Sequence, residues 1–267
     1  MTASGRNAAL LDWYDENGRD LPWRRTRDRW QILIAEVMLQ QTQVSRVVPV
    51  FERFVARYPN PQAFAVASPE EVIEAWEGLG YLRRARRLQA AAKQIADRGW
   101  PADLRELPGV GRYTAAAVAV FADGSRRAAV DVNLRRIVSR WTGVPLGEAA
   151  AFEAANELVD PARPGDWNQA MMDLGSTLCR PTRPRCPECP VAQWCVDPTI
   201  EITVPRQSAF QGSVRQARAA VLKGLVGGPA PQSSLAAEMD DETVARAIAS
   251  LLAEGAIESD GAVIRLA

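Results

Sequence analysis

All four cysteines of this 267-residue chain lie within 17 consecutive residues, and this clustering constrains the fold more than any other feature of the sequence. The cysteines are Cys179, Cys186, Cys189 and Cys195. Prolines recur between them, so residues 181–190 cannot form a regular helix. Four thiolates on such a segment can surround one ion or cluster, and their spacing is compatible with tetrahedral zinc and with a [4Fe–4S] cluster. Because protein would fill all four positions, the expected role is structural.

The chain contains no histidine, which removes several catalytic and metal-binding arrangements at once. Ser-His-Asp triads, Cys-His pairs, Cys₂His₂ zinc fingers and iron sites with two histidines and a carboxylate are all excluded. Lysine is nearly absent as well, and Lys93 and Lys223 are the only candidates for a Schiff base. Carboxylates and tyrosines therefore remain as the best general acids and bases.

Charge is balanced over the whole chain, with 32 basic and 32 acidic residues, but it is distributed unevenly. Residues 81–140 carry 13 basic and 5 acidic side chains, whereas residues 201–267 carry 6 basic and 8 acidic ones. A basic central stretch suits a polyanionic partner, although a solvated arginine face would give the same composition. The sequence shows no run of 18 apolar residues and no signal-peptide pattern, so we expect a cytoplasmic protein with reduced cysteines and no membrane contact.

The first 200 residues are expected to be mainly helical, because stretches rich in Ala, Leu, Arg and Glu are interrupted by proline and glycine. The predicted helices cover residues 5–17, 29–42, 44–58, 69–77, 82–98, 112–121, 132–141, 148–159 and 167–177. Composition shifts after about residue 205. We therefore predict a main domain of residues 1–204 and a smaller unit of residues 205–267, which we call the C-terminal module.

The C-terminal module is expected to be a small α/β unit that resembles a winged helix. Its residues 227–231 are glycine and proline, with one alanine, and predict a loop. Residues 241–254 form an amphipathic helical pattern with acidic residues in the first turn. Residues 256–266 predict two short strands joined by a turn at Asp260 and Gly261.

Residues 107–115, with the sequence LPGVGRYTA, are a candidate site for phosphate binding. Gly109 and Gly111 let the backbone turn sharply and expose N–H groups, and the predicted helix that follows adds its N-terminal donors. A Gly-x-Gly pair alone is a weak signal. The full string is the helix-hairpin-helix pattern, which grips the backbone of one DNA strand without reading its sequence. A tight turn without function is the alternative.

Two carboxylates stand out against apolar surroundings. Glu36 lies in a helix that is apolar nearly all round, where burial would raise its pKa and make it a general acid near neutral pH. The alternative is a structural glutamate paired with an arginine. Asp131 precedes a predicted helix, where it would be an N-cap. Such a carboxylate is also held rigid and kept ionised by N–H donors, so it could face a developing cation.

Together these motifs resemble the helix-hairpin-helix DNA glycosylases with an iron–sulfur cluster, and most closely the MutY-type adenine glycosylases. The resemblance covers roughly residues 8–200. Besides the cysteines and residues 107–115, it is carried by LPWR at 21–24, AEVMLQQTQV at 35–44, WEGLGYLRRARRL at 76–88, VDVNLRRI at 130–137 and NQAMMDLG at 168–175. It implies a mainly α, two-lobed fold. A central helical lobe would span about residues 28–140, and the N-terminal segment would join residues 141–200 in a cluster lobe.

One position separates two chemistries within this superfamily. The lyase-active endonuclease III relatives carry a lysine there, which attacks the sugar and forms a Schiff base. This chain has Tyr113 at that position, after Gly111 and Arg112. Lys93 and Lys223 both lie outside the motif, so β-elimination by that route has no nucleophile. We therefore predict a monofunctional glycosylase that uses water.

The resemblance also implies a role for each matching residue. The target adenine would be flipped out of the duplex, and protonated Glu36 would donate to N7 of the base. Ionised Asp131 would stabilise an oxocarbenium-like sugar, with Tyr113 and Asn133 beside the two carboxylates. The resemblance further implies an adenine pocket lined by Leu21, Trp23, Arg24, Gln169 and Met172. It implies that Gln41 and Tyr81 enter the base stack as a wedge that probes the opposite base, and that Gly109, Gly111 and Arg112 contact the DNA. The implied ligands of the [4Fe–4S] cluster are Cys179, Cys186, Cys189 and Cys195. Zinc is the less favoured occupant of the cysteine site.

The chain departs from the MutY-type pattern at two places. Leu82 stands where a second tyrosine is expected after Tyr81. The residues after Cys195 number only about 70, too few for the Nudix-like domain with which the long enzymes recognise 8-oxoguanine. We therefore expect a short form, in which residues 210–213 are the candidate contact with the lesion.

The expected partner is double-stranded DNA in which adenine stands opposite 8-oxoguanine or guanine, bound by a monomer associated with the nucleoid. A repair protein is a further possible partner for the C-terminal module. Two alternatives remain open. A mismatch thymine or uracil glycosylase is disfavoured by Gln40 and Gln41, and a non-catalytic DNA-binding iron–sulfur protein is disfavoured by Glu36, Asp131 and Tyr113.

Overall fold

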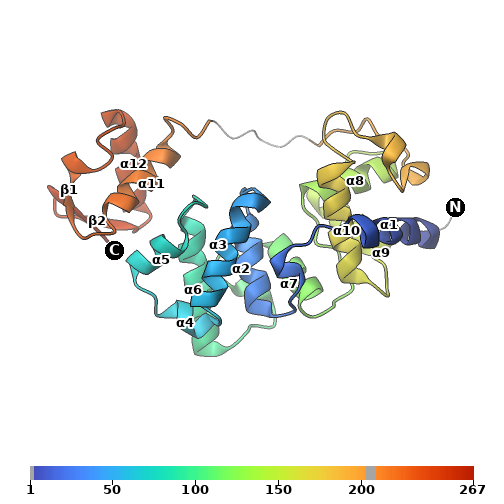
Figure 1. Ribbon diagram of the computed structural model, residues 1–267, viewed down its shortest axis with the longest axis horizontal. Coiled ribbons are helices and arrows are strands. Elements are labelled where there is room, and N and C mark those ends of the chain that lie inside the picture. The colour runs from blue at the N-terminus through green and yellow to red at the C-terminus, as the bar shows by residue number, and fades with distance from the viewer. Residues whose placement is uncertain (1–2, 203–208) are drawn as a thin grey trace. The chain divides into compact units, whose positions relative to one another are not determined.

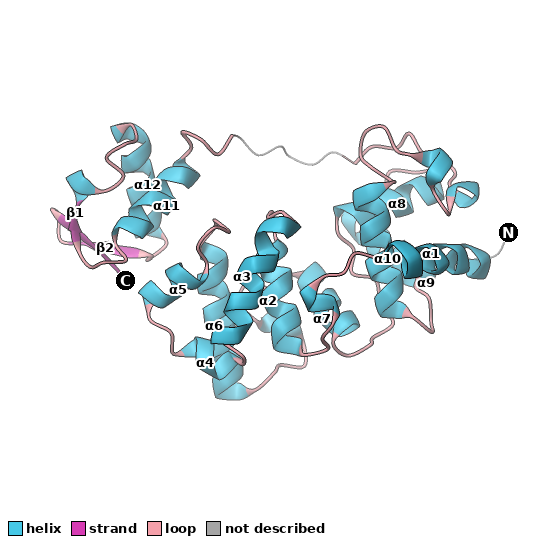
Figure 2. Ribbon diagram, viewed as in Figure 1, coloured by secondary structure: helices cyan, strands magenta, loops and turns pink. Residues whose placement is uncertain are grey.

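The computed structural model describes residues 3–202 and 209–267, and helices dominate both stretches (Figure 1). Among these residues, strands occur only near the C-terminus (Figure 2). The chain divides into two compact units, and one of the divisions falls directly after Glu36. The first unit contains residues 3–36, Asp103–Glu106 and 110–202, and the second contains Val37–Ala102, Leu107–Gly109 and 209–267. The predicted domain boundary at residues 204 and 205 lies outside the described residues.

The first unit is built from helices that share one hydrophobic core. These are α1 (Ala3–Asn17), the first part of α2 (Arg29–Leu39), α7 (Arg112–Phe121), α8 (Val132–Thr142), α9 (Glu148–Leu158) and α10 (Pro164–Thr177). Helix α10 packs beside both α1 and α8 (Figure 1). Leu10, Leu134 and Trp167 are among the fully buried side chains of the core. Residues 112–140, which were expected in the central lobe, cluster with this unit.

Local sequence sets the ends of these helices. Asp131 caps the N-terminus of α8, and Gly143, at a φ of 76°, ends the helix in the left-handed conformation. Pro164 occupies the first turn of α10, where a missing N–H costs nothing. Short 3₁₀ helices complete the unit at Pro22–Arg24, Leu104–Glu106, Cys186–Glu188 and Ala192–Trp194. Two of them lie in the cysteine segment, where regular helix was excluded.

The second unit begins with four helices around a group of aromatic side chains. The helices are α3 (Val44–Arg57), α4 (Pro61–Ala65), α5 (Pro69–Ala75) and α6 (Arg83–Arg98). The ring of Phe54 lies 4.8 Å from that of Phe64 and 6.1 Å from that of Trp76, in edge-to-face geometry. Helix α4 was not predicted. Its five residues are too few for a periodic signal, and it forms because Asn60 caps Ala63.

The C-terminal module belongs to the second unit and contains the predicted amphipathic helix and the predicted hairpin. It contains α11 (Val214–Gly224), β1 (Ala230–Pro231), α12 (Asp241–Ala253), β2 (Ile257–Ser259) and β3 (Val263–Leu266). The antiparallel sheet has the order β1-β3-β2, with Ser259 opposite Ile264. Strand β1 corrects the prediction of a loop, because Ala230 pairs with Ile264. None of the described helices has both the length and the apolar character needed to cross a membrane.

Candidate active site

Glu36 sits in the apolar part of α2, and only 5% of its surface is exposed. Burial raises the pKa of Glu36 to about 7, and the charge of Asp131 contributes to the rise. A hydrogen bond with Tyr113 opposes it. Within the part of the chain that the structure describes, Oε2 of Glu36 has no hydrogen-bond partner. A carboxyl group that is half protonated at neutral pH and has one unsatisfied oxygen is suited to donating a proton to a bound molecule.

Tyr113 lies in the first turn of α7, and its hydroxyl group meets the carboxyl group of Glu36. Burial raises the pKa of Tyr113 well above its ordinary value, and the charges of Glu36 and Asp131 raise it further. The phenol is therefore neutral at physiological pH and acts as a hydrogen-bonding group. The first unit contains no lysine, since Lys93 lies on α6 and Lys223 on α11.

Asp131 is held by two hydrogen bonds at the start of α8. Its Oδ1 accepts from the backbone N–H of Leu134 at 2.7 Å, and its Oδ2 accepts from Nδ2 of Asn133 at 2.8 Å. These are the donors expected to keep the carboxylate ionised. Burial of Asp131 outweighs the two hydrogen bonds, however, and raises its pKa.

Asn133 is in turn held by Arg136, a buried residue to which the sequence motifs assigned no role. Nη2 of Arg136 donates to Oδ1 of Asn133 at 3.0 Å and to the backbone carbonyl of Gly175 at 2.8 Å. Its Nε and Nη2 also donate to the carbonyl of Cys179, at 2.9 and 2.7 Å. One guanidinium group thus joins the support of Asp131 to the first cysteine of the cluster segment.

Close packing of α10 against α8 depends on Gly175. A Cβ atom at this position would lie 2.6 Å from Cβ of Asn133 and 3.4 Å from Nη2 of Arg136. Such a distance to Cβ is too short for any larger residue to be accepted without movement. Gly175 is the last residue of the family motif at residues 168–175, but the motif alone does not reveal its contact with Asn133.

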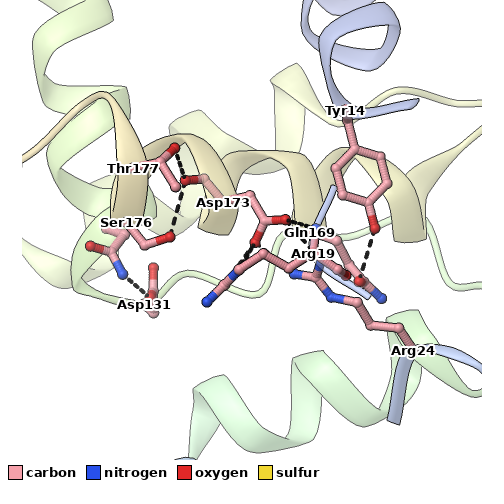
Figure 3. Close-up of polar contacts among 9 residues, drawn as sticks. Tyr14, Arg19, Arg24, Asp131, Gln169, Asp173, Ser176 and Thr177 are labelled. Carbon is pink, nitrogen blue, oxygen red and sulfur yellow. Dashed lines mark hydrogen bonds and ion pairs between the residues drawn. The ribbon is translucent and has the colours of Figure 1, made fainter. Parts of the chain in front are cut away.

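The residues predicted to line an adenine pocket lie on the 3₁₀ helix Pro22–Arg24, beside it, or on α10. Arg24 donates from both Nη atoms to Asp173 at 2.8 Å, and Arg19 donates to the same carboxylate from Nε at 2.7 Å (Figure 3). Burial raises the pKa of Asp173, but the arginine hydrogen bonds outweigh burial and leave the pKa below its usual value. Asp173 is fully buried and was missed. The signal that could have identified Asp173 is the same as for Glu36, an acidic residue within an apolar stretch.

The other predicted pocket residues also have defined positions. Gln169 accepts a hydrogen bond at Oε1 from the Tyr14 hydroxyl at 3.1 Å (Figure 3). Leu21 and Trp23 are buried, and Met172 packs partly buried against the core of the first unit. Leu21, Trp23, Arg24, Gln169 and Met172 therefore all belong to the unit that holds Glu36, Tyr113, Asp131 and Asn133.

The four cysteines lie on the segment that follows α10, and none of them forms a disulfide. Burial raises the pKa of Cys195 to about 11, and the charges of the other three thiols raise it further. Nη1 of Arg140 lies 3.1 Å from Sγ of Cys179. Among the described residues, no three His, Cys, Asp or Glu side chains form a group that would hold one metal ion. Four cysteine side chains on one short segment are nevertheless the donor set that an iron–sulfur cluster or a zinc ion requires.

The wedge residues Gln41 and Tyr81 belong to the second unit, and both have left-handed backbone conformations, with φ of 57° and 50°. Arg84 joins their two loops. In the loop that contains Gln41, its guanidinium group donates to the carbonyls of Val37 at 2.9 Å, Met38 at 2.8 Å and Gln40, and to Oγ1 of Thr42 at 2.9 Å. In the loop that contains Tyr81, it donates to the carbonyls of Leu79 and Gly80 at 3.2 Å. Arg84 was not predicted to have this role, because its partners are backbone atoms distant in sequence.

The two glycines of the predicted hairpin differ in what they require. Gly109 has a φ of 82°, and a Cβ there would lie 2.9 Å from Cβ of Arg87. Gly111 is extended at the N-cap of α7, where an added Cβ would meet open space. Arg112 places its guanidinium carbon 4.0 Å from the centre of the Phe152 ring. Of these two positions, the backbone conformation therefore requires glycine at 109 but not at 111.

Comparison with known proteins supports one family. Residues 34–161 match the family described as HhH-GPD superfamily base excision DNA repair protein. The adenine DNA glycosylase of Mycolicibacterium smegmatis is 40% identical over 93% of this chain and 91% of its own length. The adenine DNA glycosylase of Rattus norvegicus is 43% identical over 73% of this chain, and this chain covers 42% of that protein. The chain thus spans about two fifths of the length of the mammalian relatives that it matches.

Solved structures agree with this family. The structure of a thermostable thymine-DNA glycosylase has a TM-score of 0.68 and 29% identity, covering 72% of this chain and 95% of the other. A trapped endonuclease III–DNA complex, at 24% identity and a TM-score of 0.62, shares the fold. The fold is therefore the helix-hairpin-helix glycosylase fold, as predicted. The chain belongs to the HhH-GPD superfamily of base excision DNA repair proteins.

Proposed function

We propose that this protein is a monofunctional DNA glycosylase that releases adenine standing opposite 8-oxoguanine or guanine. The observation that carries the proposal is the buried pair Glu36 and Asp131, with an unsatisfied oxygen on Glu36 and Tyr113 where lyases have lysine. The names of the Mycolicibacterium and rat relatives supply the base, since both are adenine DNA glycosylases.

The chemistry assigns a different task to each carboxyl group. Protonated Glu36 donates its proton to N7 of the flipped adenine, and the electron pair of the breaking C1′–N9 bond moves into the base. Asp131, fixed by Leu134 and Asn133, stabilises the positive charge that develops on the sugar. Water then adds to C1′ and gives up a proton, which restores the pair for the next turnover. No covalent bond between sugar and protein is required.

The surrounding residues bind and orient the DNA in this proposal. Leu21, Trp23, Arg24, Gln169 and Met172 hold the adenine, while Gln41 and Tyr81 enter the stack and probe the opposite base. The first turn of α7 has no side-chain cap at Gly111, and a phosphate would bind at this start of the helix, with Gly109 and Arg112 beside it in the hairpin. In this proposal the protein is a monomer that acts on duplex DNA in the cytoplasm, at the nucleoid.

Cys179, Cys186, Cys189 and Cys195 would together hold a [4Fe–4S] cluster, with zinc as the less favoured occupant. The support is chemical: all four are thiols, they come from one proline-rich segment, and Arg140 offers a donor to Cys179. The bound group would supply positive charge and a fixed loop shape. Arg136 would transmit the position of that loop to Asn133.

A second candidate function is removal of thymine or uracil from mispairs with guanine. The specific observation in its favour is the likeness to a thymine-DNA glycosylase, at a TM-score of 0.68 and 29% identity. The higher identity to adenine glycosylases, 40% over nearly the whole chain, favours adenine.

Single-turnover base release from matched duplexes tests the proposal. The duplexes contain A:8-oxoguanine, A:G, A:T or T:G, and each reaction is analysed with and without alkali. We expect release from A:8-oxoguanine and A:G alone, with strand breaks only after alkali. Release from T:G would establish the second candidate, and strand cleavage without alkali would contradict the monofunctional chemistry. Binding to DNA without any release would leave a non-catalytic DNA-binding protein.

A further inference from the structure

The C-terminal module makes a direct hydrogen bond to the wedge tyrosine. Nη1 of Arg215, on α11, donates to the hydroxyl oxygen of Tyr81 at 2.7 Å. The guanidinium carbon lies 5.7 Å from the centre of the Tyr81 ring and 6.0 Å from that of Phe210. The guanidinium carbon of Arg84 also lies 5.5 Å from the Tyr81 ring. Tyr81 is thus in contact with two arginines, of which one comes from the module.

Further contacts fix the module to the same short segment of the second unit. Leu82, the residue that departs from the MutY-type pattern, packs against the hydrophobic core of the module. Arg86 donates from Nη2 to the carbonyl of Gly255 at 2.6 Å. Nζ of Lys223 lies 3.1 Å from the Glu77 carboxylate. Contacts therefore bracket Tyr81 in the sequence, from residue 77 to residue 86.

Tyr81 needs such support, because its backbone conformation is unfavourable. Its φ of 50° is left-handed, a conformation that is unfavourable for a residue with a Cβ. A side chain in that conformation is held only when its surroundings determine it. Arg215 supplies a charged hydrogen bond for this.

We propose that Arg215 is a specificity-determining positioning residue, through which the C-terminal module fixes Tyr81 for reading the base opposite the adenine. The inference rests on the proposed function, since that function gives Tyr81 its task. In this arrangement the module, although it is acidic overall, acts on lesion recognition through one arginine. Exposed Phe210, beside Arg215, belongs to the same assembly.

A double-mutant cycle tests the inference through binding, without requiring turnover. Arg215→Ala, Tyr81→Phe and the double variant are made in a Glu36→Gln background. Affinities are measured by fluorescence anisotropy with labelled A:8-oxoguanine and A:T duplexes. We expect Arg215→Ala to weaken binding to A:8-oxoguanine about tenfold and binding to A:T less than twofold. In the Tyr81→Phe background, Arg215→Ala should change either affinity by less than twofold.

Lys223→Ala is the matched control, because it removes a contact between the module and the rest of the second unit that does not involve Tyr81. We expect its affinities to stay within twofold of the parent. Thermal melting confirms that each variant is folded, and Tyr81→Phe removes only the hydroxyl group. Equal loss on both duplexes after Arg215→Ala would reveal a general phosphate contact and overturn the inference, as would additive effects in the cycle or a parent protein that binds both duplexes equally.

The same variants with Glu36 intact separate this inference from the proposed function. A wild type that releases no adenine would defeat the proposed function, while the binding cycle would still decide the role of Arg215. If the wild type is active, Arg215→Ala should reduce the ratio of single-turnover rates on A:8-oxoguanine and A:G about tenfold. An unchanged ratio would overturn the inference alone.

Discussion

At the scale of single residues, two buried carboxyl groups in one site differ in the hydrogen bonds that they receive. Burial raises the pKa of both Glu36 and Asp131. Asp131 receives two hydrogen bonds, from a backbone N–H and an amide, whereas Oε2 of Glu36 receives none among the described residues. The hydrogen bonds therefore favour an ionised Asp131 and a protonated Glu36. This is the distribution of charge that an acid-catalysed glycosylase needs.

The raised pKa of Glu36 makes Glu36→Gln a stabilising substitution at high pH. The folded-state pKa of about 7 exceeds the ordinary value of 4.5, so the folded protein binds more protons than the unfolded chain between these values. Stability therefore falls as pH rises through that window, by up to about 3 kcal/mol. Glutamine does not titrate, so urea unfolding should show a gain for the variant at pH 8 that is absent at pH 4. Exposed Glu153→Gln is the control, and a gain independent of pH would contradict the assignment.

At the scale of secondary-structure elements, Gly175 on helix α10 lets this helix pack closely against α8. Gly175→Ala would push Asn133 and Arg136 on α8, so we expect adenine release to fall at least tenfold and stability to fall by about 1–3 kcal/mol. Gly165→Ala lies on the same helix with open space around it, and should be neutral or slightly stabilising. Single-turnover rates and urea unfolding measure both. Equal behaviour of the two variants would show that the α8–α10 approach does not position Asn133.

The glycine hairpin before α7 gives a second matched pair. Gly109→Ala must adopt a φ of 82° and displace Cβ of Arg87, and we expect a loss of about 1–3 kcal/mol in unfolding free energy. Gly111→Ala meets no atom within 4 Å and has extended backbone, so its stability should change by less than about 0.5 kcal/mol. Chemical denaturation is sufficient to check this. A larger loss for Gly111→Ala would mean that the second glycine also has a conformational role.

The periodicity of apolar residues and the positions of proline and glycine predicted most helices and strands. They failed where an element is short or where its partner is distant in the sequence. The helices from α1 to α10 were expected except α4, whose five residues show no period. Strand β1 is two residues long and exists only because β3 lies beside it. The burial of Glu36 and the rise of its pKa were predictable, because the helix around it is apolar nearly all round. Arg136, Arg84 and Arg215 were not, because their partners lie far away in the sequence.

At the scale of the whole molecule, the residues proposed for the chemistry lie in the first unit, and the residues proposed to probe the opposite base lie in the second. The cysteine segment belongs to the first unit, and Arg136 joins its backbone to the support of Asp131. A bound group on the cysteines would therefore influence the site through hydrogen bonds and loop shape. Lysine is absent from the first unit, which is consistent with water as the attacking group.

Metal analysis of the intact protein tests the proposed occupant of the cysteine segment. Protein purified without oxygen should contain about four iron atoms and as many sulfides per chain, with broad visible absorption that is lost on oxidation. Cys195→Ser should lower both the iron content and the melting temperature. One zinc ion per chain without sulfide would show that the less favoured occupant is the true one.

The pH dependence of single-turnover adenine release from an A:8-oxoguanine duplex tests the central role of Glu36 most directly. Because the protonated carboxyl group is the active form and its pKa is about 7, the rate should be high below that pH and fall about tenfold for each unit above it. A rate that stays constant or rises between pH 6 and pH 9 would contradict proton donation by Glu36.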